Sequence, residues 1–189
     1  MKPMHPSPSH HLLSSLPAVP DYVELAFKAA AKVAGSVPLF YNDYSAEAMN
    51  AKSDRVYDML KGFKSQGIQV DGVGLQCHFT TSYYPNFTQI HDNIVRLGAL
   101  GLEVHITELD VSVKEQTQAE FEKQAMIYGQ LLDAALSAGT SVFRSFETWG
   151  FTSLVSWRGV NASALPFDDK FQKKPAYYEM LAVLQKHAK

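Results

Sequence analysis

Two carboxylic acids, Glu108 and Asp110, close the segment Glu103–Asp110, in which apolar and polar residues alternate. Val104 and Ile106 face one side and the residues between them face the other, a period of two that indicates a β-strand. A carboxylate at the end of a buried strand is unfavourable unless it is hydrogen-bonded, ion-paired or used in a reaction. The segment therefore predicts either a reactive site or a structural arrangement, in which Asp110 caps a helix and Glu108 forms an ion pair nearby.

Polar residues also follow three other apolar segments. Four polar clusters therefore end the predicted strands: Asn42–Tyr44, Gln76–His78, Glu108–Asp110 and Glu147–Trp149. In proteins that alternate strands and helices, the carboxyl ends of the strands form the edge at which sites are built. Core packing does not readily explain four such clusters, so we expect them to meet at one site.

The chemistry of these side chains is that of a carbohydrate site. Glu108, if ionised, can act as a nucleophile on an anomeric carbon, with His78 hydrogen-bonded to it and Asp110 fixing the imidazole. The alternative for His78 is a core histidine whose hydrogen bonds are satisfied. The chain's two tryptophans, Trp149 and Trp157, can cover the apolar face of a pyranose ring. The alternative is that both are ordinary core aromatics.

Hydrophobic periodicity predicts the elements that position these residues. Helices are expected at Asp21–Ala34, Ser53–Gln66, Phe87–Leu100, Glu115–Ser137 and Ala176–Lys186, and strands at Pro38–Tyr44, Val70–His78, Glu103–Asp110 and Ser141–Phe146. Strands that alternate with helices without hairpin turns indicate an α/β fold with parallel strands and crossover helices. About four strand–helix units are visible, whereas a closed (β/α)8 barrel needs eight.

Two local features refine this prediction. Asp21 is expected to be the N-cap of the first helix, because its side chain can accept a hydrogen bond from the first turn. Gly72 and Gly74 in the second strand indicate that a neighbouring segment approaches closely.

Composition excludes several classes of protein. The 189 residues are 46% hydrophobic and 19% charged, which is ordinary for a globular domain. A net charge of −2 without a basic stripe argues against a nucleic-acid partner. No apolar run approaches the roughly 20 residues that a membrane span needs. The single cysteine, Cys77, excludes an internal disulfide.

Residues 1–20 are expected to be a tail outside the domain at 21–189. They lack the continuous apolar segment of a secretory signal. His10 and His11 have no third spaced ligand, so we expect no metal there, and no cofactor is expected elsewhere. Asn86 and Asn161 begin glycosylation sequons, which would be used only if a parent protein were secreted.

Several ordered motifs resemble family 10 glycoside hydrolases, the endo-β-1,4-xylanase family. The motifs are Leu39–Tyr44 (LFYNDY), Asp71–His78 (DGVGLQCH), Leu102–Asp110 (LEVHITELD) and Trp149–Trp157 (WGFTSLVSW), and Leu165–Asp168 and Lys174–Tyr177 are similar to the closing segment of that family. The resemblance runs from about Asp21 to the end of the chain. It implies an α/β fold that is the carboxyl-terminal half of a (β/α)8 barrel.

The resemblance also implies roles for individual residues. Glu108 matches the catalytic nucleophile of a retaining enzyme, His78 the histidine bonded to it, and Asp110 the acidic residue behind that histidine. Residues around the sugar nearest the cleaved bond are matched by Gln76, Trp149 and Trp157, and Tyr44 lies by the same cleft. The implied partner is xylan or a related β-1,4-linked polysaccharide, and the implied location of the full-length parent is extracellular.

The chain departs from the family pattern at two places. Ser153 stands where the aromatic loop of the family usually has an aspartate. The acid/base glutamate of the family lies in an Asn-Glu dipeptide that does not occur in this sequence. Glu147 ends a neighbouring strand, but the family has no acid there, and a retaining pair needs a separation of ~5–5.5 Å.

Three hypotheses follow. In the first, the chain is a partial sequence or truncated product of a xylanase, carries the nucleophile without the acid/base, and hydrolyses little or no xylan alone. In the second, it is a non-catalytic, sugar-binding half-barrel. In the third, it assembles with itself or another chain, because an open half-barrel exposes two strand edges and an apolar face.

Overall fold

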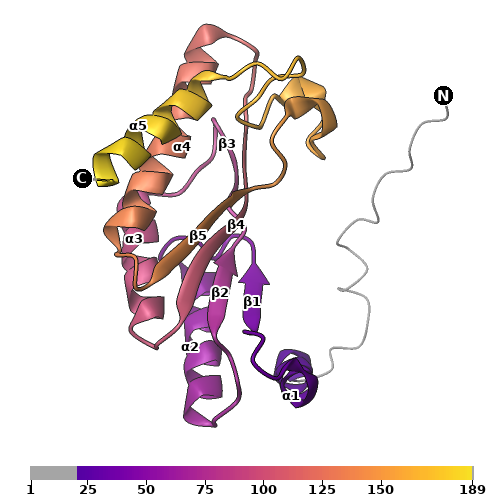
Figure 1. The fold of residues 1–189 in the computed structure, drawn as a ribbon, viewed down its shortest axis with the longest axis vertical. Coiled ribbons are helices and arrows are strands. Elements are labelled where there is room, and N and C mark those ends of the chain that lie inside the picture. The colour runs from indigo at the N-terminus through magenta and orange to yellow at the C-terminus, as the bar shows by residue number, and fades with distance from the viewer. Residues whose placement is uncertain (1–20, 189) are drawn as a thin grey trace, which may run out of the picture.

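The structure is a computed structural model that describes residues 21–188. Helices and strands alternate along the chain, as the periodicity predicts (Figure 1). The elements are α1 (Tyr22–Ala34), β1 (Phe40–Asp43), α2 (Ala51–Ser65), β2 (Gly72–Leu75), β3 (His78–Thr80), α3 (Phe87–Gly98), β4 (Glu103–Ser112), α4 (Gln118–Ser137), β5 (Phe143–Thr148) and α5 (Pro175–His187), with short 3-10 helices η2 (Ser153–Val155) and η3 (Val160–Ala162) before α5.

The strands form one parallel sheet in which β4 is central. β2 pairs with the first half of β4, β3 pairs with Asp110–Ser112 of its second half, and β5 also pairs with β4. β1 pairs with β2, again in parallel. Among the described strands, β1 pairs with β2 alone and β5 with β4 alone, so the sheet is open rather than closed into a barrel.

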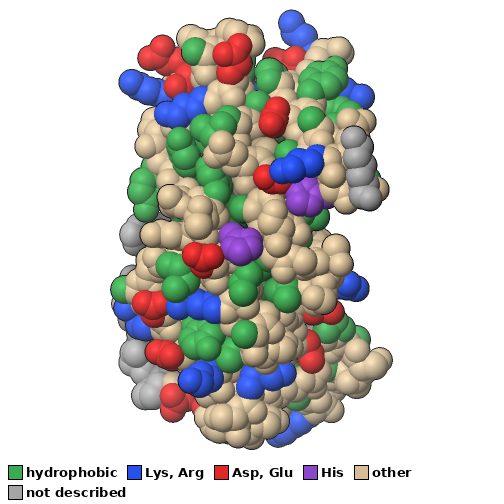
Figure 2. All heavy atoms as spheres, turned by 90° about the vertical axis from the view of Figure 1, so that its left-hand side faces the viewer, with side chains coloured by type: hydrophobic (Ala, Val, Ile, Leu, Met, Phe, Trp, Pro, Cys, Tyr) green, Lys and Arg blue, Asp and Glu red, His purple; other side chains and the backbone are tan. Residues whose placement is uncertain are grey.

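Helices cover the sheet and complete the core. Leu60 of α2, Ile94 of α3 and Leu131 of α4 are fully buried in one cluster with Val104 and Ile106 of β4. α4 packs against both α3 and α5 (Figure 1). On the outer surface of this helical side, hydrophobic side chains lie among charged and polar ones (Figure 2). Within residues 21–188, no helix combines the length and hydrophobicity that crossing a membrane requires.

One predicted strand proves to be two. The segment Val70–His78 forms β2 only as far as Leu75, and a new strand begins at His78. Between them Cys77 has a left-handed backbone, with φ of 61°. This conformation interrupts a strand and is uncommon for a residue other than glycine. The alternation of side chains in the sequence carries no sign of the break.

Neither aspartate caps a helix with its side chain. Asp21 stands at the expected N-cap position of α1, but its backbone is left-handed, with φ of 67°, instead of extended as in a typical cap, and its side chain makes no capping hydrogen bond. Asp110 lies inside β4 and pairs with His78, while α4 begins at Gln118 with Thr117 as its cap. The structural alternative for Asp110 is therefore excluded.

The two sequon asparagines lie on the surface. Asn86 is the N-cap of α3, and its side-chain oxygen accepts hydrogen bonds from the backbone of Thr88 and Gln89. Asn161 is exposed in η3.

Candidate active site

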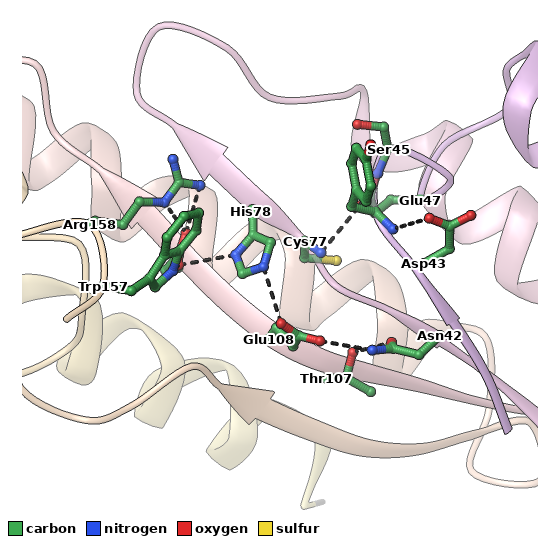
Figure 3. A network of polar contacts seen from close by, with 12 residues as sticks. Asn42, Asp43, Ser45, Glu47, Cys77, His78, Thr107, Glu108, Trp157 and Arg158 are labelled. Atoms are coloured by element: carbon green, nitrogen blue, oxygen red, sulfur yellow. Dashed lines mark hydrogen bonds and ion pairs between the residues drawn. The ribbon is translucent and has the colours of Figure 1, made fainter. Parts of the chain in front are cut away.

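Glu108 lies inside β4, which continues to Ser112 instead of ending at Asp110 as the sequence predicted. Hydrogen-bonding groups face both of its carboxylate oxygens (Figure 3). The amide nitrogen of Asn42, at the end of β1, donates to Oε1 at 2.8 Å. Nε2 of His78 lies 3.3 Å from Oε2. The Thr107 hydroxyl donates to the side-chain oxygen Oδ1 of Asn42 at 2.8 Å, and this bond fixes the direction in which the side-chain amide of Asn42 points. Donors at both oxygens suit a carboxylate, which accepts hydrogen bonds and does not donate them.

His78 lies between two carboxylates. Its Nδ1 is 3.1 Å from Oδ2 of Asp110, and its Nε2 faces Glu108. The parallel register places His78 directly beside Asp110, so the pairing of β3 with β4 brings the ring to this position. Because ionised carboxylates only accept, the ring satisfies both neighbours when both of its nitrogens carry hydrogen. These are the contacts that the sequence analysis expected of His78; its catalytic role stays a prediction.

Asp110 is fully buried, yet its charge is compensated. Trp157 Nε1 donates to Oδ2 at 2.7 Å, and Arg158 contacts Oδ1 through Nε at 3.0 Å and Nη2 at 2.9 Å. Two nitrogens of one guanidinium at Oδ1, together with an indole and an imidazole at Oδ2, make burial of this carboxylate tolerable. Asp110 thus links β4 to the loop after β5, and it contacts His78 at Nδ1, the ring nitrogen that does not face Glu108.

The two tryptophans are not core aromatics. Trp157 is 59% exposed and Trp149 is 50% exposed. The Trp157 ring lies edge-on to His78 at 5.2 Å between ring centres, with the Arg158 guanidinium 4.7 Å from the Trp157 ring centre. Its indole is therefore fixed by Asp110 at one end and open to solvent over much of its surface. An exposed, oriented indole is suited to stacking on a sugar.

The other residues predicted to bind sugar, Trp149, Tyr44 and Gln76, are less directly connected to Glu108. The Trp149 backbone amide donates to the carbonyl of Leu109, next to Glu108 in β4. Tyr44 is 55% exposed, and the Lys52 ammonium lies 3.8 Å from its ring centre. Gln76 is half-buried, and its backbone amide donates to Asp43. Within the described chain, no polar contact joins the side chains of Trp149, Tyr44 or Gln76 to Glu108, so their roles stay predictions.

The sequence predicted no individual contact for four residues in and around this network: Asn42, Thr107, Arg158 and Glu47. Asn42 stood in a recognised strand-end cluster and Arg158 directly follows Trp157, so position alone pointed toward both. Glu47 gave no signal, because it lies in a segment without periodicity. Its carboxylate is buried and accepts a hydrogen bond from the backbone amide of Cys77.

The structure shows the surroundings of Ser153 and of Glu147, the two residues weighed against the family pattern. Ser153 is buried, and its hydroxyl and its backbone amide both donate to the carbonyl of Phe167, so the serine itself supports the loop. Glu147 is exposed on β5 and accepts a hydrogen bond from the Ser145 hydroxyl.

No group of three or more histidine, cysteine, aspartate or glutamate side chains suited to a metal ion occurs within residues 21–188. His10 and His11 lie outside the described residues.

Comparison with known proteins identifies the family. A family model described as glycosyl hydrolase family 10 matches residues 12–183. The chain belongs to this family. It is 40% identical over 171 residues to endo-1,4-beta-xylanase B of Neocallimastix patriciarum, covering 90% of this chain and 19% of that protein. It is 32% identical over 177 residues to endo-1,4-beta-xylanase B of Thermotoga neapolitana, covering 90% of this chain and 50% of that protein.

Solved structures of family 10 xylanases share the fold. Xylanase 10B from Thermotoga petrophila RKU-1, in complex with xylobiose, matches with a TM-score of 0.83 and 36% identity, over 90% of this chain and 53% of that one. A second match is a mutant of TsXylA, an intracellular xylanase from Thermoanaerobacterium saccharolyticum, in complex with xylotetraose. It has a TM-score of 0.78 and 34% identity, over 85% of this chain and 49% of that one. The chain thus spans about half of these relatives, and its open parallel sheet corresponds to part of their (β/α)8 barrel.

Proposed function

We propose that residues 21–189 are a partial catalytic domain that carries the nucleophile of a retaining endo-β-1,4-xylanase. The observation that carries this proposal is Glu108 itself: a carboxylate within the central strand β4, contacted by Asn42 at one oxygen and by His78 at the other. The family membership and the xylanase names of the relatives support it.

In the proposed reaction Glu108 attacks the anomeric carbon of a xylose unit and forms a covalent glycosyl–enzyme ester. The leaving sugar oxygen takes a proton from a second carboxylic acid, and that group then removes a proton from the water that cleaves the ester. Asn42 and His78 orient the Glu108 oxygens, and Asp110 orients His78. Because the Asn-Glu dipeptide of the family is absent, we place the second carboxylate outside these 189 residues.

Sugar binding is assigned to the side chains around the nucleophile. Trp157 has an exposed indole fixed beside His78, and Trp149 is attached by its backbone next to Glu108. Both would stack on apolar sugar faces, while Gln76 and Tyr44 would contact hydroxyl groups. The substrate would be xylan or a related β-1,4-linked polysaccharide. An extracellular location of the parent stays a prediction, since one matched relative is named intracellular.

The isolated chain is expected to hydrolyse little or no xylan. Loss of general acid–base assistance costs roughly 10²–10⁴-fold in rate. A substrate with a dinitrophenolate leaving group, such as 2,4-dinitrophenyl β-xylobioside, does not need that proton. With it, we expect a stoichiometric burst of dinitrophenol, because the glycosyl–enzyme forms and then persists without a base to activate water. Mass spectrometry should locate the xylobiosyl group on Glu108.

Two variants and one added nucleophile make the assay decisive. Glu108→Gln should abolish both the burst and the adduct, whereas Glu103→Gln, at the exposed opposite end of β4, should leave them unchanged. Azide attacks without a base, so it should restore turnover and yield the β-xylobiosyl azide. An adduct on another residue, or a burst that survives Glu108→Gln, contradicts the assignment. The assignment is also contradicted if no adduct forms with the chain alone and none forms when the first half of a family 10 barrel is added as a separate polypeptide.

A second candidate is a non-catalytic sugar-binding half-barrel, and the exposed indoles of Trp149 and Trp157 favour it. Titration with xylo-oligosaccharides separates the two. Binding that survives Glu108→Gln and disappears in Trp149→Ala, without any covalent adduct, would support this candidate over the enzyme.

A further inference from the structure

Glu47 is a buried carboxylate that joins two separate loops of the site. It follows β1, and its side chain is largely hidden, since the residue is 3% exposed. Its Oε1 accepts hydrogen bonds from the backbone amides of Ser45 at 2.9 Å and Cys77 at 3.1 Å (Figure 3). Ser45 and Cys77 are 32 positions apart in the chain. A single oxygen atom therefore fixes both backbones relative to each other.

Both amides belong to residues with a left-handed backbone. Ser45 has φ of 54° and Cys77 has φ of 61°. Residues other than glycine persist in this conformation only where the surroundings hold them there. The shared acceptor on Glu47 is such a restraint, and the Asn93 side chain adds to it by donating to the carbonyls of Ala46 and Glu47.

These two turns lead directly to the groups that contact Glu108. The turn at Ser45 follows β1, whose residue Asn42 donates to one oxygen of Glu108. The turn at Cys77 separates β2 from β3, and His78 begins β3. Without that turn, β2 would continue in register and the side chain at 78 would follow the alternation of a regular strand.

We propose that Glu47 is a positioning residue, whose carboxylate locks the turns at Ser45 and Cys77 and thereby sets the placement of Asn42 and His78 around Glu108. This role rests on the function proposed above for Glu108. Among residues 21–188, Glu47 forms no direct ion pair: Lys52 bonds instead to Asp43 and to the Tyr44 carbonyl. Burial raises the pKa of Glu47, while the amides of Cys77 and Ser45 act in the opposite direction.

The full 189-residue chain contains its own reporter of the turn. Cys77 is the single cysteine and is completely buried, and burial raises the pKa of its thiol, so labelling by a thiol reagent requires the turn to open. The imidazole nitrogen signals of His78 in an NMR spectrum, assigned by their loss in His78→Gln, report the ring placement. Neither measurement involves sugar transfer, so both remain valid if Glu108 is not a nucleophile.

Glu47→Ala is expected to raise the rate of Cys77 labelling by roughly tenfold or more, the factor that corresponds to losing a hydrogen bond to a charged acceptor. The labelling should depend little on denaturant, because the opening is local. The His78 ring signals should shift. Glu47→Gln keeps an acceptor oxygen in place and should return both measurements toward the values of the unmodified chain.

Leu132→Ala is the matched control. It creates a cavity in α4, an element separate from the turns at Ser45 and Cys77, and should speed Cys77 labelling only through global unfolding, with a steep dependence on denaturant. The proposal is overturned if Glu47→Ala folds and its His78 signals are unchanged. It is also overturned if the rate of Cys77 labelling in Glu47→Ala, and the dependence of that rate on denaturant, are the same as in Leu132→Ala. If Glu47→Ala does not fold, Glu47→Asp decides: it withdraws the oxygen by one methylene, and unchanged labelling and His78 signals in it overturn the proposal equally.

Discussion

At the scale of single residues, the site is a series of contacts in which each group orients the next. Arg158 and Trp157 hold Asp110, Asp110 holds His78, and His78 meets Glu108. The side chains of Glu108 and His78 are 14% and 17% exposed, whereas that of Asp110 is completely buried. The carboxylate proposed to react is thus the more accessible one, and the carboxylate that supports it is sealed in the core.

Asp110→Ala should destabilise the fold strongly. It leaves the guanidinium of Arg158 and the ring of His78 without their carboxylate in a buried setting, which typically costs about 3–5 kcal/mol. The free energy of unfolding measured by denaturant titration tests this. Glu115→Ala is the control at an exposed position just after β4 and should stay within about 0.5 kcal/mol of the unmodified chain. Equal stability of the two variants would contradict the role given to Asp110.

At the scale of elements, periodicity predicted the order and approximate bounds of the helices and strands, because it reports which face of an element is buried. It also placed Glu108 and Asp110 on one strand. It did not find the break at Cys77 or the left-handed backbone at Asp21. At the break, the Cys77 backbone amide donates a hydrogen bond to the Glu47 carboxylate, a tertiary contact that the local sequence does not encode.

The glycines of β2 were correctly expected to mark a close approach. A methyl group added at Gly72 would collide with the Phe40 ring, and one added at Gly74 would collide with the side chains of Asn42 and Thr107. These contacts show that β1 side chains lie directly over the backbone of β2. The close approach brings Asn42 within reach of Glu108.

Gly74→Ala should therefore cost about 1–3 kcal/mol of stability through overpacking and displace the Asn42 amide from Glu108. Gly62→Ala in α2 is the contrasting change. Its added methyl meets only Gln66 at 4.0 Å, and it should stabilise the helix by about 0.5–1 kcal/mol. Thermal unfolding compares the two, and side-chain amide NMR signals follow Asn42. If both variants shift the melting temperature in the same direction, the tight fit at Gly74 is wrong.

Lys174 joins the aromatic loop to α5 and should make stability depend on alkaline pH. It is buried and donates to the carbonyls of Ser163 and Leu165, and burial lowers its pKa to about 8 from 10.5. Between these values the unfolded chain binds more protons than the folded one, so the free energy of unfolding rises with pH. Relative to Lys174→Met, the unmodified chain should gain roughly 3 kcal/mol from pH 8 to 10.5. A constant difference across that range would refute the pKa shift.

At the scale of the whole molecule, the site is assembled from segments far apart in the sequence. Asn42 and Glu108 are 66 positions apart, and they meet because β1, β2 and β4 run parallel with their carboxyl ends at one edge. The alternation of strands and helices predicted that arrangement and so predicted that the clusters would converge. It did not specify which atoms touch, since contacts such as Arg158 to Asp110 depend on the path of an irregular loop.

We propose that the open edges of the sheet also make the chain associate. β1 and β5 each pair on one side only among the described strands, and unpaired edges attract other strands. The average mass measured by analytical ultracentrifugation should rise with concentration. Adding the first half of a relative such as Thermotoga petrophila xylanase 10B should instead give a defined one-to-one complex with xylanase activity. A chain that remains a compact monomer at all concentrations, and that does not bind the added half, would rule out association through the sheet edges.

The position of β4 has a consequence for heat damage. Its backbone is paired along both halves by β2, β3 and β5, whereas Asn42 lies on an edge strand and Trp157 on a loop. Elements with fewer partners loosen first when a protein is warmed. On warming, Asn42 and Trp157, which are proposed to orient Glu108 and to cover the sugar, should therefore lose their positions while Glu108 and Asp110 still lie on an intact strand. The proposed selectivity for the sugar would then be lost at a lower temperature than the position of the proposed nucleophile.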